Sequence, residues 1–402
     1  LEGYLFSNYL FTNNPKVAGE SINWDIQFSD SPSTYNLGLQ TLDMIGILSN
    51  AYIQTKDISY LKKAYSILSS WINYSLSNPK SNFVWYDHSV SSRVLNIMYF
   101  LSTKSDNSSS REFFKNSVNE SELIDVLRNH AKYLLNPSNY SYNNNHGIMA
   151  DRALISLAFF LPHDPASDVW LETGLARMQA QFSALFEKDG SYAENSPGYA
   201  QGALSWFVEM QDFLEPRGHL LITGNFNELI PSSFQFLFDL TMPNDHFPMW
   251  GDTLDALVNY NRGQFNPEKK ALSVYPNGGY AIISDKDLWL GIKSGYVGGM
   301  AHKHEDDLSF VLFALGKDIF LDPGMYNYEK TDPYRKYFVS ANAHNTIIVD
   351  DQSFSTSLIN DSRSGIVSWK DDGDLQEITV FNNLYASSSI QRTIYYIKPG
   401  IV

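Results

Sequence analysis

Cysteine is absent from this 402-residue chain. A disulfide scaffold, a thiolate metal site and a cysteine nucleophile are therefore excluded. Because cysteine-free proteins occur in both reducing and oxidising compartments, the absence does not by itself indicate where the protein works.

The chain also lacks long apolar runs. The longest, Ala153–Pro162, is shorter than the ~18 apolar residues that a membrane-spanning helix needs, and we interpret it as one buried helix. No charged segment followed by an apolar one, as in a signal peptide, stands at Leu1, and a mature secreted protein would look the same. At the other end, Ile401 and Val402 lie in strand-like sequence, so we expect the chain to be cut there.

Basic residues are scarce. The chain has 29 Lys and Arg against 44 Asp and Glu, a net charge of −15, and both its first 270 residues and the remainder are acidic. A basic nucleic-acid-binding module is therefore excluded. The hydrophobic fraction of 43% and the charged fraction of 18% are those of a globular protein rather than a disordered one. At roughly 150 residues per domain, the length predicts two or three domains.

Up to about residue 260, apolar residues recur at helical spacing, as in the series from Trp170 to Leu185. Pairs such as Asn78-Pro79 and Asn136-Pro137 end these stretches. Seven or more helices in series with polar connectors favour a ring or solenoid of helical hairpins over a four-helix bundle. We therefore predict an (α/α) toroid over residues 1–265.

The apolar pattern changes to a period of two after Pro276-Asn277-Gly278-Gly279. Short alternating stretches separated by Gly and Asp turns predict antiparallel strands. The predicted strands are 280–283, 288–292, 308–315, 346–349, 365–369, 377–381 and 392–397. They predict a second domain, an antiparallel β-sandwich, over residues 270–402.

Three of the nine histidines fall in the predicted β region: His302, His304 and His344. We predict that His302-Lys303-His304 lies in a strand with both imidazoles on one face, because side chains alternate. With Asp322, which follows a predicted strand, these imidazoles would suit a tetrahedral zinc site. The alternative is that the histidines form hydrogen bonds within a β core.

The run Asn143-Asn144-Asn145-His146-Gly147 precedes a predicted helix. Asparagine commonly caps a helix N-terminus at such a position. Alternatively, the Asn145 amide donates a hydrogen bond to a substrate carboxylate and the His146 imidazole moves a proton.

Of the 25 tyrosines, Tyr199 is distinguished only by the polar, Gly/Pro-containing stretch that precedes it, Glu194-Asn195-Ser196-Pro197-Gly198. Most tyrosines pack in the core or lie at the surface. Other side chains near loop–helix junctions are weaker candidates for sugar contacts: Trp85 with His88 and Arg93, and Trp250 with Asp252.

Several motifs in one order resemble the heparinase II/III-like polysaccharide lyases. In the β region they are His302-Lys303-His304-Glu305-Asp306, Leu321-Asp322-Pro323-Gly324, Tyr337 and Ala343-His344-Asn345-Thr346. Asn145-His146 and the stretch Glu194–Tyr199 resemble helical-domain motifs of this family, with a separation most similar to heparinase III types. The resemblance implies an (α/α) toroid followed by an antiparallel β-sandwich. It also implies a secreted or periplasmic enzyme that cleaves an acidic polysaccharide by β-elimination.

The resemblance further implies catalytic roles. Asn145 would neutralise the uronate carboxylate, because a proton next to a charged carboxylate is only weakly acidic unless a donor stabilises the transition state. Tyr199 would protonate the leaving glycosidic oxygen. His302, or His146 as second choice, would remove the C5 proton. The residues expected to contact substrate are Trp85, His88, Arg93, Glu194, Trp250 and Tyr337.

The resemblance assigns a zinc ion to His304, Asp322 and His344. We expect this ion to brace the β domain rather than to act in the reaction, because its ligands would be held within β structure. The sequence departs from similar proteins at Val339, where they often have an arginine.

The net charge disfavours the most sulfated polymers, which would need a basic trough. We expect a uronate polymer of lower charge density, such as a heparan-like, hyaluronan-like or bacterial exopolysaccharide chain. Local positive charge would come from Arg93, Arg152, Lys293, Lys303, Arg335 and Lys336. Two alternatives stay open: a glycoside hydrolase that uses Glu194 with Asp252 as its two carboxyls, and a non-catalytic carbohydrate-binding protein. The sequence predicts no oligomeric state.

Overall fold

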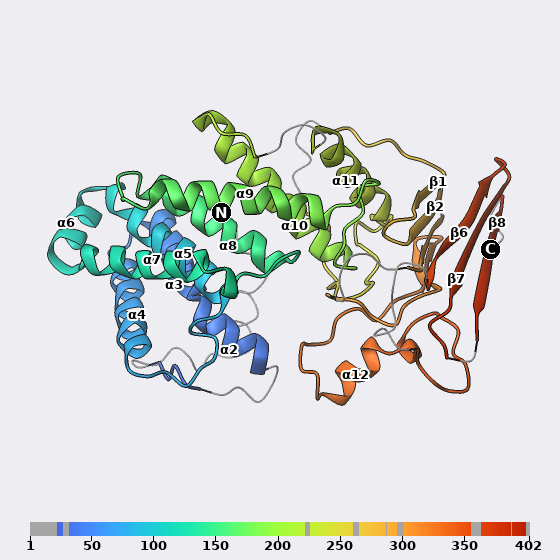
Figure 1. Cartoon of the computed structure of the whole chain (residues 1–402), viewed down its shortest axis with the longest axis horizontal. Coiled ribbons are helices and arrows are strands. Elements are labelled where there is room, and N and C mark those ends of the chain that lie inside the picture. The colour runs from blue at the N-terminus through green and yellow to red at the C-terminus, as the bar shows by residue number, and fades with distance from the viewer. Residues whose placement is uncertain are drawn as a thin grey trace. The chain divides into compact units, whose positions relative to one another are not determined.

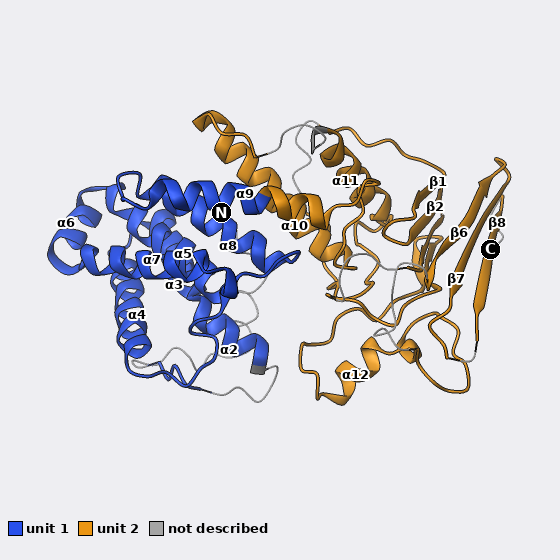
Figure 2. Cartoon of the chain, viewed as in Figure 1, with its two compact units in different colours: residues 1–178 blue, residues 179–402 orange. Residues whose placement is uncertain are grey.

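The computed structural model describes residues 22–26, 32–221, 226–259, 265–286, 288–295, 301–354, 363–386 and 388–398. The expectations for the two ends of the chain lie outside these residues. The chain divides into two compact units, residues 1–178 and residues 179–402 (Figure 2).

The first unit is helical. Its helices are α2 (Pro32–Thr41), α3 (Asp43–Thr55), α4 (Ile58–Leu76), α5 (Asp87–Ser102), α6 (Ser108–Ser117), α7 (Glu120–Leu135), α8 (Asn145–Phe160) and the first part of α9 (Ser167–Leu185). Helix α5 packs against α2, α3, α7 and α8, so it is the central helix of the unit (Figure 1). Its side chains Val90, Val94, Ile97 and Phe100 are fully buried.

Side-chain caps fix where several of these helices begin. The Asp57 carboxylate accepts a hydrogen bond from the Ser59 backbone N–H at the start of α4, and Asn107 forms a capping box with Ser110 at the start of α6. Asn144 caps α8 in the same way, accepting from the His146 backbone N–H. Such caps satisfy backbone donors that have no partner within the helix, so the start of α8 is fixed at the candidate residues Asn145 and His146.

The second unit combines helices and sheets. After the end of α9 come α10 (Pro197–Leu214), α11 (Phe226–Leu240), β1 (Leu272–Tyr275), β2 (Tyr280–Asp285), β3 (Leu288–Lys293), β4 (Ser309–Ala314), β5 (Lys317–Phe320), α12 (Pro333–Val339), β6 (Ser364–Asp371), β7 (Leu375–Asn382) and β8 (Ile390–Ile397). Strands β1 to β5 form one antiparallel sheet in sequence order, and β6 to β8 form another.

The two sheets share one hydrophobic core. Ala281, Ile283 and Leu290 of the first sheet pack with Ile378 and Val380 of the second. Every residue of β3 is buried, as expected of a strand covered on both faces. These contacts make the β part a sandwich.

Helix α11 packs on the first sheet. The Trp289 indole Nε1 donates to the backbone oxygen of Asp239 at 3.0 Å, and the Tyr275 hydroxyl donates to its carboxylate at 2.6 Å. Gly291 lies beneath this layer. A Cβ there would come within 2.3 Å of the Trp289 ring and 2.6 Å of the Trp250 ring, so the close approach of these rings requires glycine.

The predicted fold class, a helical part followed by an antiparallel β-sandwich, is confirmed. Helices give way to strands between Leu240 and Leu272, and β1 lies just before the Pro276–Gly279 turn at which the predicted strands begin. The division into compact units places α10 and α11 with the sheets. It therefore falls after residue 178, whereas the predicted domain boundary lies between residues 265 and 270. None of the helices described is long and apolar enough to cross a bilayer.

Two local predictions are wrong. Residues 346–349 form no strand, and Val349 makes only an isolated bridge with Gln352. The run from His302 to His304 lies in a turn and the coil that follows it, because His302 adopts a left-handed conformation with φ of 58°.

Candidate active site

In the first unit, the candidate residues gather where α5 begins beside α8. Asn145 and His146 open α8, and Asp87 opens α5. The His146 Nδ1 lies 3.1 Å from the Asp87 carboxylate oxygen Oδ1. Asn145 is buried. The structure therefore brings an imidazole and a carboxylate together beside the predicted amide.

Asp87 is held by further donors. Its carboxylate also accepts hydrogen bonds from the Ser141 hydroxyl and from the His88 backbone N–H, the latter at 2.7 Å. Burial alone would raise the pKa of the Asp87 carboxyl, but its hydrogen bonds and its electrostatic interaction with His146 together lower it. Asp87 is thus a carboxylate at neutral pH.

His88 is buried beside this pair and was expected to contact substrate. Its ring meets the His146 ring edge to face, with centroids 5.1 Å apart. Burial lowers the pKa of His88 to about 3, so the imidazole is neutral at neutral pH. With only 7% of its surface exposed, His88 supports His146 rather than facing a ligand.

Arg93 was also expected to contact substrate, and the structure corrects this. The residue is 0% exposed, and its guanidinium donates to His130 Nε2 at 3.0 Å, to the Gln40 backbone oxygen at 2.6 Å and to the Val84 backbone oxygen. It also lies 4.4 Å from the Trp71 ring. With these partners, Arg93 links helices of the first unit.

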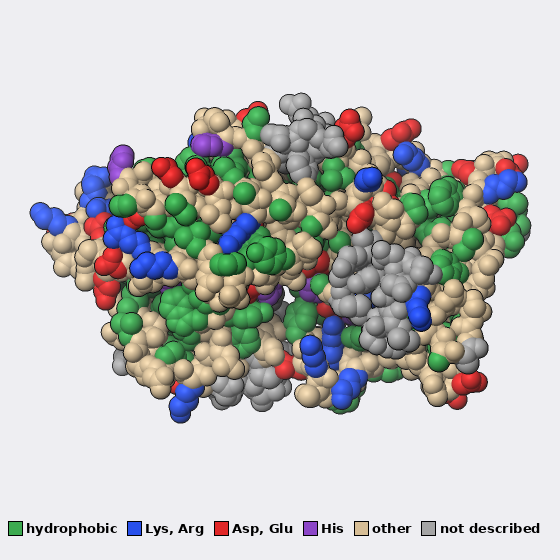
Figure 3. All heavy atoms as spheres, viewed as in Figure 1, with side chains coloured by type: hydrophobic (Ala, Val, Ile, Leu, Met, Phe, Trp, Pro, Cys, Tyr) green, Lys and Arg blue, Asp and Glu red, His purple; other side chains and the backbone are tan. Residues whose placement is uncertain are grey.

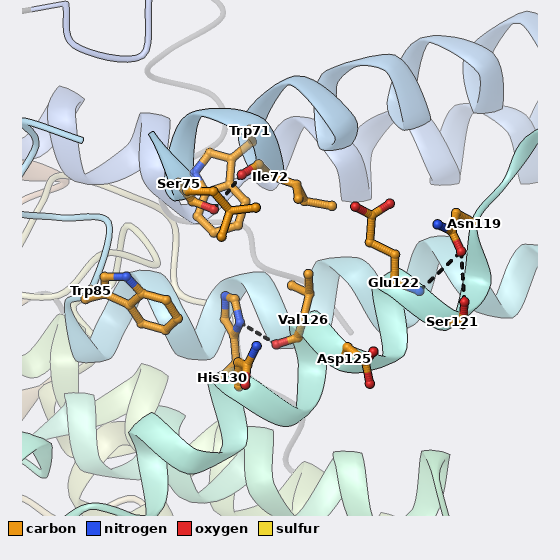
Figure 4. A pocket seen from close by; sticks show the side chains of 12 residues that line it. Trp71, Ile72, Ser75, Trp85, Asn119, Ser121, Glu122, Asp125, Val126 and His130 are labelled. Carbon is orange, nitrogen blue, oxygen red and sulfur yellow. Dashed lines mark hydrogen bonds between the residues drawn. The ribbon is translucent and has the colours of Figure 1, made fainter. Parts of the chain in front are cut away.

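Trp85 is 43% exposed and lies at a hollow of about 400 Å³ between α4 and α7 (Figure 4). Its ring lies 5.3 Å from the His130 ring and 5.5 Å from the Tyr133 ring, and its backbone oxygen accepts from the Tyr133 hydroxyl. Glu122 and Asp125 line the same hollow. Trp85 is therefore a firmly held, accessible indole, of the kind that stacks on sugar rings.

In the second unit, Tyr199 lies in the first turn of α10. Ser196 caps this helix, and Pro197 occupies its first turn, where proline is favoured. The Tyr199 ring stacks on the His302 imidazole, with centroids 3.6 Å apart and planes 19° apart. The structure thus brings two predicted catalytic residues into direct contact, although 103 positions separate them in the sequence.

The Tyr199 hydroxyl forms a short hydrogen bond with the hydroxyl of Tyr328. Burial raises the pKa of Tyr199, and the Tyr328 hydrogen bond lowers it less than burial raises it. Burial likewise raises the pKa of Tyr328. Tyr199 therefore keeps its proton at neutral pH, as a general acid must.

Asp252 connects the histidines of this unit. Its carboxylate lies 3.0 Å from His302 Nδ1 and 2.9 Å from His304 Nε2, and it also accepts a hydrogen bond from the Arg335 guanidinium. Burial would raise the pKa of Asp252, but these three donors hold it well below its usual range. Asp252 is thus a fixed negative charge in contact with a ring nitrogen of both imidazoles.

Gly251 allows these segments to meet. It has φ of 57°, and a Cβ there would lie 2.4 Å from the His302 backbone oxygen and 2.6 Å from that of Asn195. The Asp252 backbone N–H donates to the same His302 oxygen at 3.3 Å. Glycine is therefore required for the close approach of the Asp252 and His302 segments.

The residue between the two histidines points elsewhere. Lys303 is buried and pairs with Asp306 and, at 3.0 Å, with Asp307. Lys293 is also buried, and donates to the backbone oxygens of Gly278 and Gly295. Together with Arg93, these cations are committed to the interior, so they do not line the basic trough expected from the sequence.

The proposed metal ligands lie close to one another. His344 Nδ1 lies 2.7 Å from the Asp322 carboxylate, and the His304 and His344 rings are 5.4 Å apart. His304 Nδ1 and His344 Nε2 are buried without a hydrogen-bond partner. Buried unpaired imidazole nitrogens are unfavourable unless a ligand satisfies them. Within the described ranges, no three His, Cys, Asp or Glu side chains converge as a formed metal site.

The remaining predicted contacts divide into buried and exposed residues. Trp250 is 0% exposed and packs against Tyr280 and Trp289, which corrects its predicted contact with substrate. Glu194 is buried and accepts a hydrogen bond from the Tyr192 hydroxyl at 2.6 Å. Tyr337 is 53% exposed on α12 and stays available for a ligand.

Three residues of these clusters were not predicted as site residues: Asp87, Tyr328 and Arg335. Arg335 entered the sequence analysis only as local positive charge. Tyr328 follows the Asp322-Pro323-Gly324 motif by four residues, and Asp87 lies between the candidates Trp85 and His88. Their proximity in sequence to the motifs was the only signal that could have identified them. Their contacts with His146, Tyr199 and Asp252 depend on packing between segments that are distant in the sequence.

Comparisons with known proteins agree with these features. The model of the heparinase II/III N-terminus matches residues 3–279, and that of the heparinase II/III-like C-terminal domain matches residues 267–400. Heparin-sulfate lyases from Bacteroides thetaiotaomicron and Pedobacter heparinus are each 21% identical over 94% of this chain, which spans 59% and 61% of their lengths. An exo-oligoalginate lyase from Saccharophagus degradans is 23% identical over 56% of this chain and 39% of its own length.

Solved structures agree on the fold. A crystal structure of heparinase III superposes with a TM-score of 0.78 at 18% identity, covering 94% of this chain and 63% of that chain. A structure of a heparan sulfate lyase from Pedobacter heparinus gives a TM-score of 0.64 at 19% identity, covering 94% and 63%. The present chain thus spans about three fifths of the length of these heparin-sulfate lyases and heparinase III structures. It belongs to the heparinase II/III family.

Proposed function

We propose that this chain carries the catalytic machinery of a polysaccharide lyase that cleaves a uronic-acid-containing polymer by β-elimination. The observation that carries the proposal is the stack of Tyr199 on His302, whose Nδ1 lies 3.0 Å from the Asp252 carboxylate. The reaction needs an acid that protonates the departing oxygen, and the Tyr199 phenol held in this stack can supply that proton, while an imidazole removes the proton from C5. The family membership and the names of the relatives, heparin-sulfate lyase and exo-oligoalginate lyase, support the same class.

In the proposed reaction, the Asn145 amide donates to the uronate carboxylate and stabilises the negative charge that develops as C5 loses its proton. An imidazole, His302 or His146, accepts that proton. The C4–O4 bond breaks, a double bond forms between C4 and C5, and Tyr199 protonates the departing O4. The raised pKa of Tyr199 keeps the phenol protonated for this step.

We further propose that His304, Asp322 and His344 hold a zinc ion. The two buried, unpaired imidazole nitrogens support this assignment. The ion would fix the segments that carry these ligands, and with them the turn at His302. No step of the reaction requires it.

The substrate we propose is a uronate polymer of moderate charge density, such as a heparan-like, hyaluronan-like or bacterial exopolysaccharide chain, acted on outside the cytoplasm. Lys293, Lys303 and Arg93 are buried, and basic side chains on the face in Figure 3 are interspersed with acidic ones. Such a surface suits a densely sulfated chain poorly. Trp85 and Tyr337 are the exposed aromatic side chains that we assign to sugar contacts.

A panel of uronate polymers tests the proposal. A lyase produces ultraviolet absorbance from the new double bond, together with one new reducing end per cleavage. A glycoside hydrolase would produce reducing ends without this absorbance and would depend on Glu194 or Asp252, both of which are engaged with neighbouring side chains here. Binding to a polymer without any product would support a carbohydrate-binding protein instead.

A further inference from the structure

We propose that Asp87 is a positioning residue that holds His146 in one tautomer, with its proton on Nδ1 and its lone pair on Nε2, so that Nε2 is the proton acceptor. The inference rests on the proposed lyase function. It starts from the 3.1 Å approach of His146 Nδ1 to the Asp87 carboxylate. An ionised carboxylate can accept hydrogen bonds but cannot donate them, so the imidazole nitrogen that faces it carries the proton.

Groups other than His146 hold the Asp87 carboxylate in place. Asp87 is buried at the first position of α5, and Ser141 and the His88 backbone N–H occupy it as further donors. His146 opens α8, which packs directly against α5. Both partners therefore belong to packed helix termini rather than mobile loops, and the geometry of the pair is preorganised.

Three side chains surround the His146 ring: Asp87, His88 and Tyr86. His88 meets its ring edge to face and is neutral, so it does not repel a forming imidazolium. Tyr86 meets the same ring edge to face on another side, with centroids 5.6 Å apart. The side chain of His146 is 24% exposed, so a substrate can reach it. The carboxylate then stabilises the positive charge that the imidazole gains, as in catalytic aspartate–histidine pairs.

In the elimination, the C5–H bond breaks and an Nε2–H bond forms on His146. The electron pair of the C5–H bond becomes the second bond between C4 and C5. The electron pair of the C4–O4 bond leaves with O4, which takes a proton from the general acid of the proposed reaction. Asp87 exchanges no proton and touches no substrate atom, so it acts only through His146.

The tautomer of His146 can be measured directly. Nitrogen-15 NMR of the full chain, with the His146 signals assigned from a His146→Gln variant, is expected to show a protonated Nδ1 and an unprotonated Nε2 over the pH range in which the ring is neutral. In Asp87→Asn, the amide can donate to Nδ1, so the protonated nitrogen is expected to change to Nε2. A wild-type His146 protonated at Nε2 would overturn the proposal, whatever the activity.

Kinetics supply the second test. Asp87→Asn is expected to lower kcat by on the order of 10²- to 10⁴-fold with little change in KM. Ser141→Ala keeps the carboxylate and removes one of its donors, so we expect less than a tenfold loss. Asp168→Asn removes an exposed carboxylate of the same unit and should leave kcat unchanged. An Asp87→Asn enzyme with wild-type kcat would refute the positioning role.

The two proposals fail separately. If no polymer gives unsaturated product with the wild-type chain, the lyase proposal fails, while the tautomer experiment still decides the Asp87–His146 arrangement. If Asp87→Asn does not fold, as judged by circular dichroism, the wild-type NMR measurement remains decisive.

Discussion

The phenol ring of Tyr199 lies face to face with the imidazole of His302, with ring centroids 3.6 Å apart. Asp252 holds that imidazole from its Nδ1 side, and Tyr328 holds the Tyr199 hydroxyl. Each partner of the stack is thus fixed at a second point. This arrangement keeps a protonated phenol and an oriented imidazole in contact.

Asp252→Ala is expected to lower the free energy of unfolding by about 3–5 kcal/mol, because it leaves Arg335 and two imidazoles without their shared carboxylate. Urea unfolding measures the loss. Asp255→Ala, which removes an exposed carboxylate paired with His246, should change stability by less than about 1 kcal/mol. Equal effects of the two substitutions would contradict the central role given to Asp252.

Acid should destabilise the first unit through two buried histidines. Burial lowers the pKa of His88 and of His130 to about 3 from the ordinary 6.5. The unfolded chain therefore binds more protons than the folded one between these values, and the free energy of unfolding falls as the pH drops below 6.5. At pH 5 the loss should be about 2 kcal/mol per histidine relative to pH 7.

The variant His130→Gln isolates one of these contributions. The substitution removes the imidazole that accepts from Arg93, so it lowers the free energy of unfolding at every pH. Between pH 7 and pH 5, however, the free energy of unfolding of the variant should fall by about 2 kcal/mol less than that of the wild type. If the free energy of unfolding of the variant depends on pH as steeply as that of the wild type, His130 is not a neutral, buried imidazole in the folded protein.

The purified chain should contain about one zinc ion, detectable by elemental analysis, if His304, Asp322 and His344 form the proposed site. His344→Ala should lose the ion and lower the Tm, and a chelator should lower the Tm of the wild type but not of the variant. The exposed His163 provides the matched control, since His163→Ala should keep the metal. A metal-free wild type with an unchanged Tm after chelation would rule the site out.

Trp85→Ala is expected to raise KM about fivefold, roughly 1 kcal/mol of lost stacking, with kcat nearly unchanged. Steady-state kinetics on the active polymer measure both constants. Trp369→Ala removes a comparably exposed indole from β6 and should alter neither constant. If Trp85→Ala behaves in the same way, the hollow beside Trp85 does not bind substrate.

The sequence was sufficient for the features that depend on local pattern. The change of apolar period locates the passage from helices to strands, and the cap at Asn144 marks the start of α8 beside Asn145 and His146. Both signals come from neighbouring residues, because helix caps and hydrophobic periods are local properties.

Features that depend on packing could not be predicted in this way. Arg93 looks like a cation for binding substrate, yet backbone oxygens of Gln40 and Val84 and the ring of Trp71 satisfy it inside the first unit. Asp87 meets His146 across 59 positions of sequence. The left-handed conformation at His302 does not follow from residue alternation.

The most direct test compares the wild type with Tyr199→Phe on a polymer that the wild type cleaves. Phenylalanine keeps the ring that stacks on His302 but removes the proton, so the rate of absorbance increase from the new double bond should fall by on the order of 10²- to 10⁴-fold. Tyr334→Phe, at an exposed tyrosine of α12, should keep the wild-type rate. A Tyr199→Phe chain that forms unsaturated product at the wild-type rate would contradict the proposed role of Tyr199 as the catalytic acid.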